Sequence, residues 1–196
     1  AGRQGRGLME NFVNYSEAEV ISVCDVDFEK TTLFSKKLNQ KLTENQRSNR
    51  KIKEFLSYRE LLDDKELDAV VIATPDHWHA QMSVDSAKLK KDVYCEKPLS
   101  SSVYEGRAIV DAARKYQIIF QTGSMQRSWG QFRHAVELIR NKYIGEVKTI
   151  NVAIGAPYIS CDLPTQPTPK NINWDDWIGP APYRGYHKDL ACPIGD

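Results

Sequence analysis

The sequence predicts an α/β protein whose first part is a doubly wound parallel sheet and whose second part begins an α+β domain. Two observations support this fold class. From about residue 19 to residue 145, short apolar runs alternate with helical patterns of about 10–15 residues, as they do in parallel sheets covered by helices on both faces. From residue 147 the pattern changes to period two, which is typical of an antiparallel strand buried on one face. The expected domains are residues 1–122 and residues 123–196.

Apolar runs indicate where the strands of the parallel sheet lie. We expect these strands at residues 19–25, 67–73, 93–95 and 118–120, because each run is short and bounded by polar or turn-forming residues. Residues 43–53 are polar and basic, so they are expected to form a solvated loop.

Capping signals indicate where the intervening helices begin. Asp27 and Asp76 each precede a helical pattern and are expected to be N-caps. Capping boxes at residues 57–60 and 102–105 predict two further helix starts. A last helix is expected between Ser128 and about Gly145, after an opening helix whose apolar residues lie one turn apart.

Composition and charge exclude several function classes. The 196 residues hold 27 Lys and Arg against 26 Asp and Glu, a net charge of +1, so nothing general favours binding to nucleic acid or to an anionic membrane. No apolar run approaches the ~20 residues of a membrane span. The four cysteines are widely spaced, which argues against a metal site and fits free thiols in a reducing, cytoplasmic setting. An export signal ahead of Ala1 stays open.

A glycine pair at the first helix start and an acid about twenty residues later together predict a dinucleotide site. Gly2-x-x-Gly5 matches the second half of the Gly-x-Gly-x-x-Gly fingerprint, in which backbone amides accept a pyrophosphate. Asp25 ends the next predicted strand, where the fingerprint has its acceptor for the ribose hydroxyls. A carboxylate there repels the extra phosphate of NADP and favours NAD, although Arg3 and Arg6 keep NADP open.

The segment Cys95–Leu99 presents a lysine at the end of a strand. Lys97 stands between Glu96 and Pro98, and the proline keeps the residue before it out of the helical region. The chain can therefore hold an amine at a defined point. The alternative is an ordinary surface lysine at a strand–helix turn.

A second cluster follows the strand at residues 67–73. Thr74 and Pro75 close this strand, and His77, Trp78 and His79 begin the next helix. Two histidines two residues apart point in different directions on a helix, which disfavours a shared metal ion. We expect this cluster to face a bound cofactor or to cap the helix. In the final segment, Trp174 and Trp177 could stack on a sugar, with core packing as the alternative.

Taken in order, these motifs resemble the glucose–fructose oxidoreductase / inositol dehydrogenase (Gfo/Idh/MocA) family. The resemblance covers essentially the whole chain, and the Thr-Pro-x-x-x-His and Glu-Lys-Pro motifs are its most specific parts. The residues that carry it are Gly2-Arg3-Gln4-Gly5, Asp25, Thr74-Pro75-Asp76-His77-Trp78-His79, Glu96-Lys97-Pro98, Gly123-Ser124-Met125-Gln126-Arg127 and Gly145-Glu146-Val147.

The resemblance implies a Rossmann domain followed by an open mixed-sheet domain, and oxidation of a sugar, inositol or related polyol by NAD(P). It places Lys97 beside the nicotinamide and the reacting hydroxyl, makes the peptide bond before Pro98 cis, and assigns Gln126 with the other motif residues to the cofactor site. It also implies a homo-oligomer formed through the sheet of the second domain.

Two departures from the family pattern shape the expectations. The first strand and first fingerprint glycine would stand ahead of Ala1, and the catalytic Asp and His of the substrate domain would follow Asp196. A central strand would pair with the strands at residues 20–25 and 69–73. We therefore expect residues 1–196 alone not to be a competent enzyme, and any folded form to take that strand from elsewhere.

The leading functional hypothesis is an NAD-dependent oxidoreductase that transfers a hydride from a carbinol carbon. Lys97 would hydrogen-bond the reacting oxygen and assist its loss of a proton, with the expected His as the main general base. Redox-assisted glycoside cleavage with tightly held NAD is a second hypothesis. A cofactor-binding regulator without turnover is a third.

Overall fold

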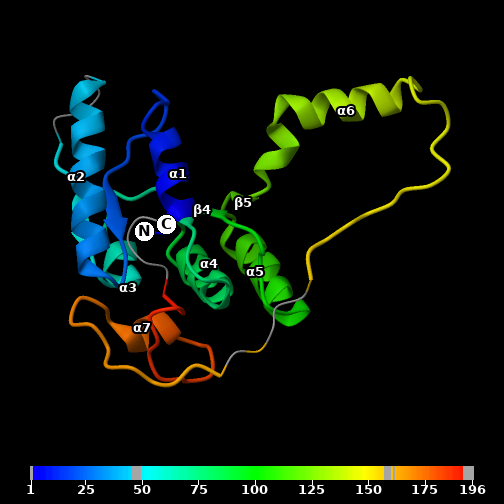
Figure 1. Cartoon of the computed structure of the whole chain (residues 1–196). Helices are drawn as coiled ribbons and strands as arrows, with labels where there is room; N and C mark the ends of the chain where they lie inside the picture. The colour runs from blue at the N-terminus through cyan, green and yellow to red at the C-terminus, as the bar shows by residue number, and fades with distance from the viewer. Residues whose placement is uncertain (1, 46–49, 157–159, 161, 192–196) are drawn as a thin grey trace. The chain divides into compact units, whose positions relative to one another are not determined.

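The computed structural model describes residues 2–45, 50–156, 160 and 162–191 (Figure 1). The chain divides into two units, which we describe separately. The first unit joins residues 1–122 to the residues from Pro164 onward, and the second is residues 123–163. The structure groups residues 164–191 with residues 2–122, and the expected domains, residues 1–122 and residues 123–196, stay a prediction.

One part of the first unit is built on the parallel pair β1 (Ser22–Cys24) and β2 (Lys53–Phe55). The helices α2 (Phe28–Glu44) and α3 (Tyr58–Leu62) pack against both strands. Side chains from the opening helix α1 (Arg3–Phe12) join the apolar core that lies between these elements. Its buried members are Val13, Val20, Val23, Phe34, Leu38, Leu42 and Ile52.

The other part of the first unit is a three-stranded parallel sheet in the order β3-β4-β5. Two helices, α4 and α5, pack on each other, and α4 also packs on β3 and β4. The elements are β3 (Ala69–Ile72), the 3-10 turn η1 (Asp76–Trp78), α4 (His79–Lys88), β4 (Asp92–Cys95), α5 (Val103–Tyr116) and β5 (Phe120–Thr122).

The strands β1 and β3 belong to separate sheets. Backbone groups alternate along a parallel strand, so those of Ser22 and Cys24 point away from β2, and those of Ala69 and Val71 point away from β4. No described strand pairs with either edge. The orders β2-β1 and β3-β4-β5 are the two flanks of the predicted doubly wound sheet, and a central strand between them stays a prediction.

The capping signals had mixed outcomes. Asp27 is confirmed as the N-cap of α2, because its carboxylate accepts the amides of Glu29 and Lys30, and Ser102 caps α5 through the amide of Glu105. The prediction that Asp76 is an N-cap is wrong. Asp76 lies inside η1, and α4 begins at His79 without a side-chain cap.

Two strand expectations also need correction. The loop expected at residues 43–53 is wrong at both ends, because Thr43 and Glu44 belong to α2 and Lys53 begins strand β2. Residues 46–49 of this segment lie outside the described residues. Periodicity missed β2 because the strand has only three residues. The strand expected at residues 118–120 lies at residues 120–122.

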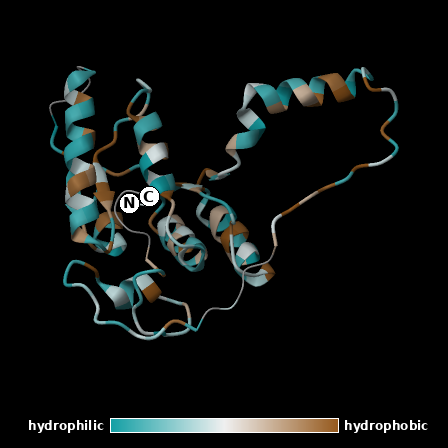
Figure 2. Ribbon diagram, in the orientation of Figure 1, coloured by the Kyte–Doolittle hydropathy of each residue, from teal (hydrophilic) through white to brown (hydrophobic). Residues whose placement is uncertain are grey.

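In the second unit, the turn η2 (Met125–Ser128) leads to α6 (Gly130–Arg140), which has no buried residue. Over the described residues 147–156, the predicted antiparallel strand is not formed, and Ile150, Val152 and Ile154 are each more than three-quarters exposed. Figure 2 shows hydrophobic, brown stretches along the extended chain after α6. A period-two pattern supplies one face of a strand, but a strand also needs a paired backbone.

Residues 164–191 form a lobe with its own small core. Its short helix α7 (Trp174–Ile178) stacks the ring of Trp174 on that of Trp177 at 4.6 Å between centroids, and Tyr186 meets Trp174 edge-on. Trp174 is 5% exposed, so core packing describes it better than sugar stacking.

Candidate functional site

The predicted site residues lie mainly where β1, β3 and β4 end. In open parallel sheets, ligands bind outside the carboxyl ends of the strands. Asp25 follows β1, Thr74 follows β3 and Lys97 follows β4. The strand ends of the two sheets are therefore the place at which a dinucleotide site can be assembled.

Glu96 links the turn after β4 to the first turn of α1. Its carboxylate is 4% exposed, and Oε1 accepts a hydrogen bond of 2.9 Å from the side-chain amide of Gln4. The hydroxyl of Tyr94 donates to the same oxygen at 3.4 Å, and the backbone amide of Lys97 donates to Oε2 at 3.1 Å. Two predicted site segments that lie 92 residues apart in the sequence thus meet at one buried carboxylate.

Burial raises the pKa of the Tyr94 phenol, and the charge of Glu96 beside it raises this pKa further. Tyr94 therefore stays neutral and can keep donating its proton to Glu96. Sequence reasoning missed Tyr94, although its place in an alternating strand, two residues before Glu96, puts both side chains on the same face.

His79 bridges the loop after β3 and the loop after β4. It is 1% exposed, with Nδ1 2.6 Å from the carbonyl oxygen of Pro98 and Nε2 3.0 Å from the carbonyl oxygen of Thr74. The ring thus contacts the backbone of both loops. Its predicted contact with a cofactor stays a prediction, and its visible role is to hold the β3 and β4 loops together.

Thr74 carries an unmet hydrogen-bonding group at the end of β3. Its hydroxyl oxygen is buried and has no hydrogen-bond partner among the described residues. Buried hydroxyl groups are nearly always satisfied, by protein, water or ligand. This orphan group therefore fits a site that a polar ligand completes.

The start of α1 fits the phosphate groups of such a ligand. Gly2 is the N-cap, no side chain of the described residues caps the first turn, and the first turn holds no acidic residue. A side chain at Gly2 would meet nothing within 4 Å, so the backbone there is open to a bound group. Uncapped amides and the helix dipole together favour an anion. Gly5 is buried, while Arg3 is exposed.

Asp25 follows β1 in a half-buried position. Its Oδ1 accepts the amide of Asp27 at 3.0 Å, a local turn that fixes the carboxylate on its own backbone. Asp27 in turn caps α2, so the loop that carries Asp25 is held by the helix after it.

Lys97 is exposed, and its peptide bond to Pro98 is cis, as the family resemblance implied. The backbone on either side of its amine is anchored, through Glu96 before it and through the carbonyl group of Pro98 after it. Gln126 is exposed in η2 and belongs to the second unit, so its predicted part in the cofactor site stays a prediction.

His77 and Trp78 contact the lobe that contains α7. His77 Nε2 lies 2.9 Å from the carbonyl oxygen of Trp177, and the indole N–H of Trp78 donates to the carbonyl group of Asp176 at 2.9 Å. Pro75 is half-buried between Thr74 and η1. The cofactor roles predicted for these residues remain untested, and the contacts with α7 were not foreseen.

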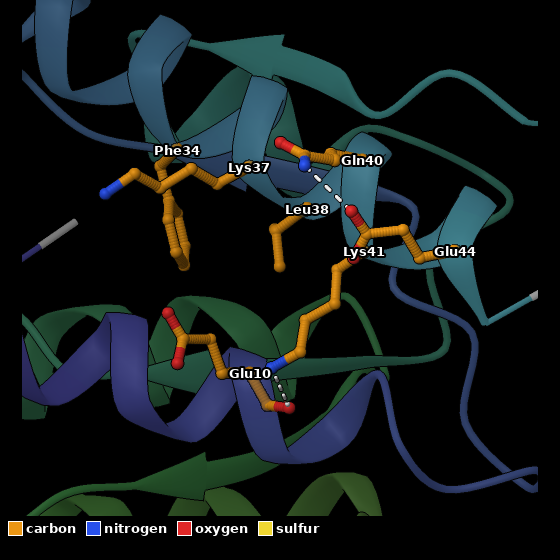
Figure 3. Close-up of a pocket in the computed structure, with 7 residues that line it drawn as sticks. All are labelled: Glu10, Phe34, Lys37, Leu38, Gln40, Lys41 and Glu44. Carbon is orange, nitrogen blue, oxygen red and sulfur yellow. Dashed lines mark hydrogen bonds between the residues drawn. The ribbon is translucent and has the colours of Figure 1, made fainter.

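A cavity of about 230 Å³ lies elsewhere, between α1 and α2 (Figure 3). Glu10 lines it from α1 and the other lining residues come from α2, with Lys41 Nζ donating to the carbonyl oxygen of Glu10 at 3.4 Å. None of the predicted site residues lines this cavity. It is therefore separate from the strand ends.

Other ligand classes gain no support from the described residues. No group of three or more His, Cys, Asp or Glu among them could hold a metal ion. Within the same residues, no helix is long and apolar enough to cross a bilayer. Cys24 and Cys95 are free, and burial raises the pKa of their thiols to about 12 and about 11, whereas Cys161 and Cys192 lie outside the described residues.

Comparison with known proteins shows which family this chain matches. Residues 1–124 match the model of the Gfo/Idh/MocA oxidoreductase family, described as an NAD-binding Rossmann fold. A myo-inositol 2-dehydrogenase of Thermotoga maritima is 26% identical over 156 residues, which cover 80% of this chain and 43% of the relative. An α-N-acetylgalactosaminidase of Shewanella oneidensis is 44% identical over 62 residues, which cover 32% of this chain and 14% of the relative.

Solved structures share the fold. A scyllo-inositol dehydrogenase from Lactobacillus casei, crystallised with bound NAD(H) and scyllo-inositol, aligns with a TM-score of 0.64 at 21% identity. The alignment covers 74% of this chain and 40% of that one. The chain thus spans less than half the length of the relatives it matches.

Proposed function

Because the chain belongs to the Gfo/Idh/MocA family of oxidoreductases, we propose that the whole protein oxidises a hydroxyl group of a sugar, cyclitol or related polyol with NAD. The observation that carries the proposal is the hydrogen bond between Gln4 and Glu96. It joins the helix start that suits a pyrophosphate to the turn that presents Lys97. Binding groups and a candidate proton-transfer group are thereby part of one connected site.

The residues divide into those that would hold the dinucleotide and one that would act on the substrate. The first turn of α1 would hold the pyrophosphate, Asp25 the ribose hydroxyls, and Thr74 a polar group at the end of β3. NAD supplies a hydride acceptor when it is bound. A carboxylate at Asp25 disfavours the extra phosphate of NADP, which supports the choice of NAD.

Lys97 would act at the reacting oxygen. As a hydride leaves the carbinol carbon, the proton on the oxygen must leave as well, and an amine within hydrogen-bond reach can orient that oxygen and pass the proton on. Glu96 and His79 would position the turn rather than take the proton, because both are buried and bonded to protein groups.

The test uses the full-length protein, loaded with NAD and mixed with a panel of inositols and sugars while NADH absorbance is followed. A dehydrogenase gives net NADH that scales with substrate. If no member of a broad panel of inositols, aldoses and sugar acids gives NADH from enzyme with bound NAD, the proposal is wrong.

A second candidate is redox-assisted glycoside cleavage. It is favoured by the 44% identity of 62 residues to an α-N-acetylgalactosaminidase. In that case a chromogenic glycoside should release its leaving group while NADH forms only transiently. Recording NADH absorbance and leaving-group release after mixing separates the two functions. A non-catalytic regulator would bind NAD and give neither signal.

A further inference from the structure

We infer that residues 171–173 position the carboxylate of Asp25 and thereby help to set the preference for NAD over NADP. The inference rests on the proposed function, because it takes Asp25 as the acceptor for the ribose hydroxyls. It assigns a positioning role to residues that lie outside the motifs of the site. The contact between the side chains of Asn171 and Asp27, which carries part of this role, spans 144 residues of the sequence.

The carboxylate of Asp25 depends on the turn that follows it. Its Oδ1 accepts the backbone amide of Asp27 at 3.0 Å, and this bond fixes the direction of the side chain. The backbone amide of Asp25 itself donates to the carbonyl group of Phe55 in β2 at 3.3 Å. The main chain of Asp25 is therefore held by the sheet, whereas its carboxylate keeps its place only while the backbone of Asp27 does.

The backbone around Asp27 is paired with a remote segment of the chain. Asp27 forms an isolated antiparallel bridge with Ile172. Two backbone hydrogen bonds flank the bridge, from the amide of Phe28 to the carbonyl group of Asn171 at 3.1 Å and from the amide of Asn173 to the carbonyl group of Val26 at 3.0 Å. The turn that orients Asp25 is thus bonded on both sides to residues 171–173.

A side-chain bond strengthens this pairing. The amide of Asn171 donates to Oδ1 of Asp27 at 3.0 Å, and the same oxygen accepts the backbone amides of Glu29 and Lys30. Asp27 is 4% exposed. Hydrogen bonds to an ionised carboxylate are stronger than those between neutral groups. Asp27 is therefore fixed between the start of α2 and Asn171.

These bonds begin where the pairing of the sheet ends. Strand β1 ends at Cys24, and a further strand beside it is expected to pair with residues 20–25. Such a strand would hold the main chain up to Asp25, but Val26 and Asp27 lie beyond it. The positioning role of residues 171–173 is therefore the same whatever pairs with the other edge of β1.

The position of the carboxylate matters because the two cofactors differ only by a phosphate on the adenosine ribose. A fixed carboxylate accepts the ribose hydroxyls of NAD and repels the phosphate of NADP. Both effects weaken when the carboxylate moves, because a hydrogen bond needs a defined geometry and Coulomb energy falls with distance. A loosened turn should therefore bind NAD less tightly and oppose NADP less, so the ratio of the two affinities reports the position of Asp25.

The experiment measures binding of NAD and NADP to the full-length protein by calorimetry. Asn171→Ala removes the side-chain donor to Asp27, and Asn171→Asp replaces it with a carboxylate that repels Asp27. The alanine variant should lower the NAD-to-NADP affinity ratio about threefold to tenfold, the range for one net hydrogen bond, and the aspartate variant should lower it further. The control is Asn14→Ala, at an exposed asparagine whose side chain donates to the carbonyl group of Glu10.

A second pair of variants isolates a backbone bond. Asn173→Pro removes the amide that donates to Val26, at a position whose φ of −79° suits proline. The matched control is Asn173→Ala, which also loses the side chain that caps α7 but keeps the amide. The proline variant should lower the NAD-to-NADP ratio, whereas the alanine variant should leave it within about twofold, because the cap acts on α7. In an Asp25→Ser background the proline change should have no further effect on the ratio, since the carboxylate it positions is gone.

Hydrogen exchange of the ligand-free protein gives a measurement that does not depend on the cofactor. The amide of Asp27 is the donor to Asp25, so Asn171→Ala and Asn173→Pro should each raise its exchange rate. Unchanged exchange at this amide, an unchanged affinity ratio in both variants, or an equal loss of NAD and NADP would overturn the inference. If the parent protein binds neither cofactor, the proposed function fails, and the exchange rate at Asp27 still decides whether residues 171–173 hold the turn.

Discussion

The loops after β1 and β4 are both held by partners distant in sequence, but they leave different groups available. The loop after β1 is paired to the backbone of Ile172 and Asn173, and the half-buried carboxylate of Asp25 is turned back onto its own backbone. The turn after β4 is anchored through Glu96 and Pro98, and it leaves the amine of Lys97 exposed. The difference suggests a division of labour, with recognition at the first loop and chemistry at the second.

Lys97→Ala should give the largest effect among the tests of this division. If the amine acts only at the reacting hydroxyl, turnover should fall by ~10²–10⁴-fold, the range for lost acid–base assistance, while NAD affinity changes less than about twofold. Steady-state kinetics and calorimetry on the full-length protein measure the two effects, and Lys65→Ala serves as an exposed control. A variant that keeps more than half its turnover would return Lys97 to an ordinary surface turn.

The corresponding test at the first loop is Asp25→Ser. Losing a charged acceptor for the ribose hydroxyls should weaken NAD by about 10- to 100-fold, since hydrogen bonds to charged groups contribute ~1.5–3 kcal/mol. NADP should gain relative to NAD, because the repulsion of its extra phosphate disappears. Binding ratios before and after the change give the answer, with Asp63→Ser as an exposed control. Equal affinity of the parent for both cofactors would contradict the role of Asp25.

The sequence could predict those features that depend on neighbouring residues. Asp27 and Ser102 were recognised as caps because the signal for a helix start consists of a capping residue and the few residues that follow it. The strand that contains Cys95 was recognised because residues 93–95 are a short apolar run bounded by polar residues. These local signals were sufficient for the fold class and for the order of the site loops.

Contacts between remote residues could not be predicted in this way. Nothing near Gln4 indicates Glu96, and Asn173 signals a helix start but not its backbone bond to Val26. The period-two pattern that includes Val152 is real, yet a strand needs a second backbone, and no described segment supplies one. The sequence therefore indicated candidate site residues, whereas only the structure showed which contacts hold their loops.

A smaller expected effect concerns Glu96, the anchor of the second loop. In Glu96→Gln the amide N–H₂ group must replace one acceptor oxygen, so either the amide of Lys97 or the Gln4–Tyr94 pair loses its partner. The cost should be about 1–3 kcal/mol of unfolding free energy, measured in urea. The pKa of Tyr94, which burial and then the Glu96 charge raise, should move back toward its ordinary value in a spectrophotometric titration. An unchanged phenol pKa would mean that burial alone sets it.

The smallest effects compare the helix caps that follow the two loops. Ser102, four residues after Pro98, is exposed and accepts one amide, so Ser102→Ala should cost about 0.5–1 kcal/mol. Asp27 is 4% exposed, and its Oδ1 accepts two helix amides and the side chain of Asn171, so Asp27→Ala should cost about 2 kcal/mol or more. In the Asn171→Ala background this cost should shrink, because one of the donors has already gone. Urea unfolding of the four variants measures all three values, and equal costs for the two caps would show that the contact with Asn171 adds nothing to the first loop.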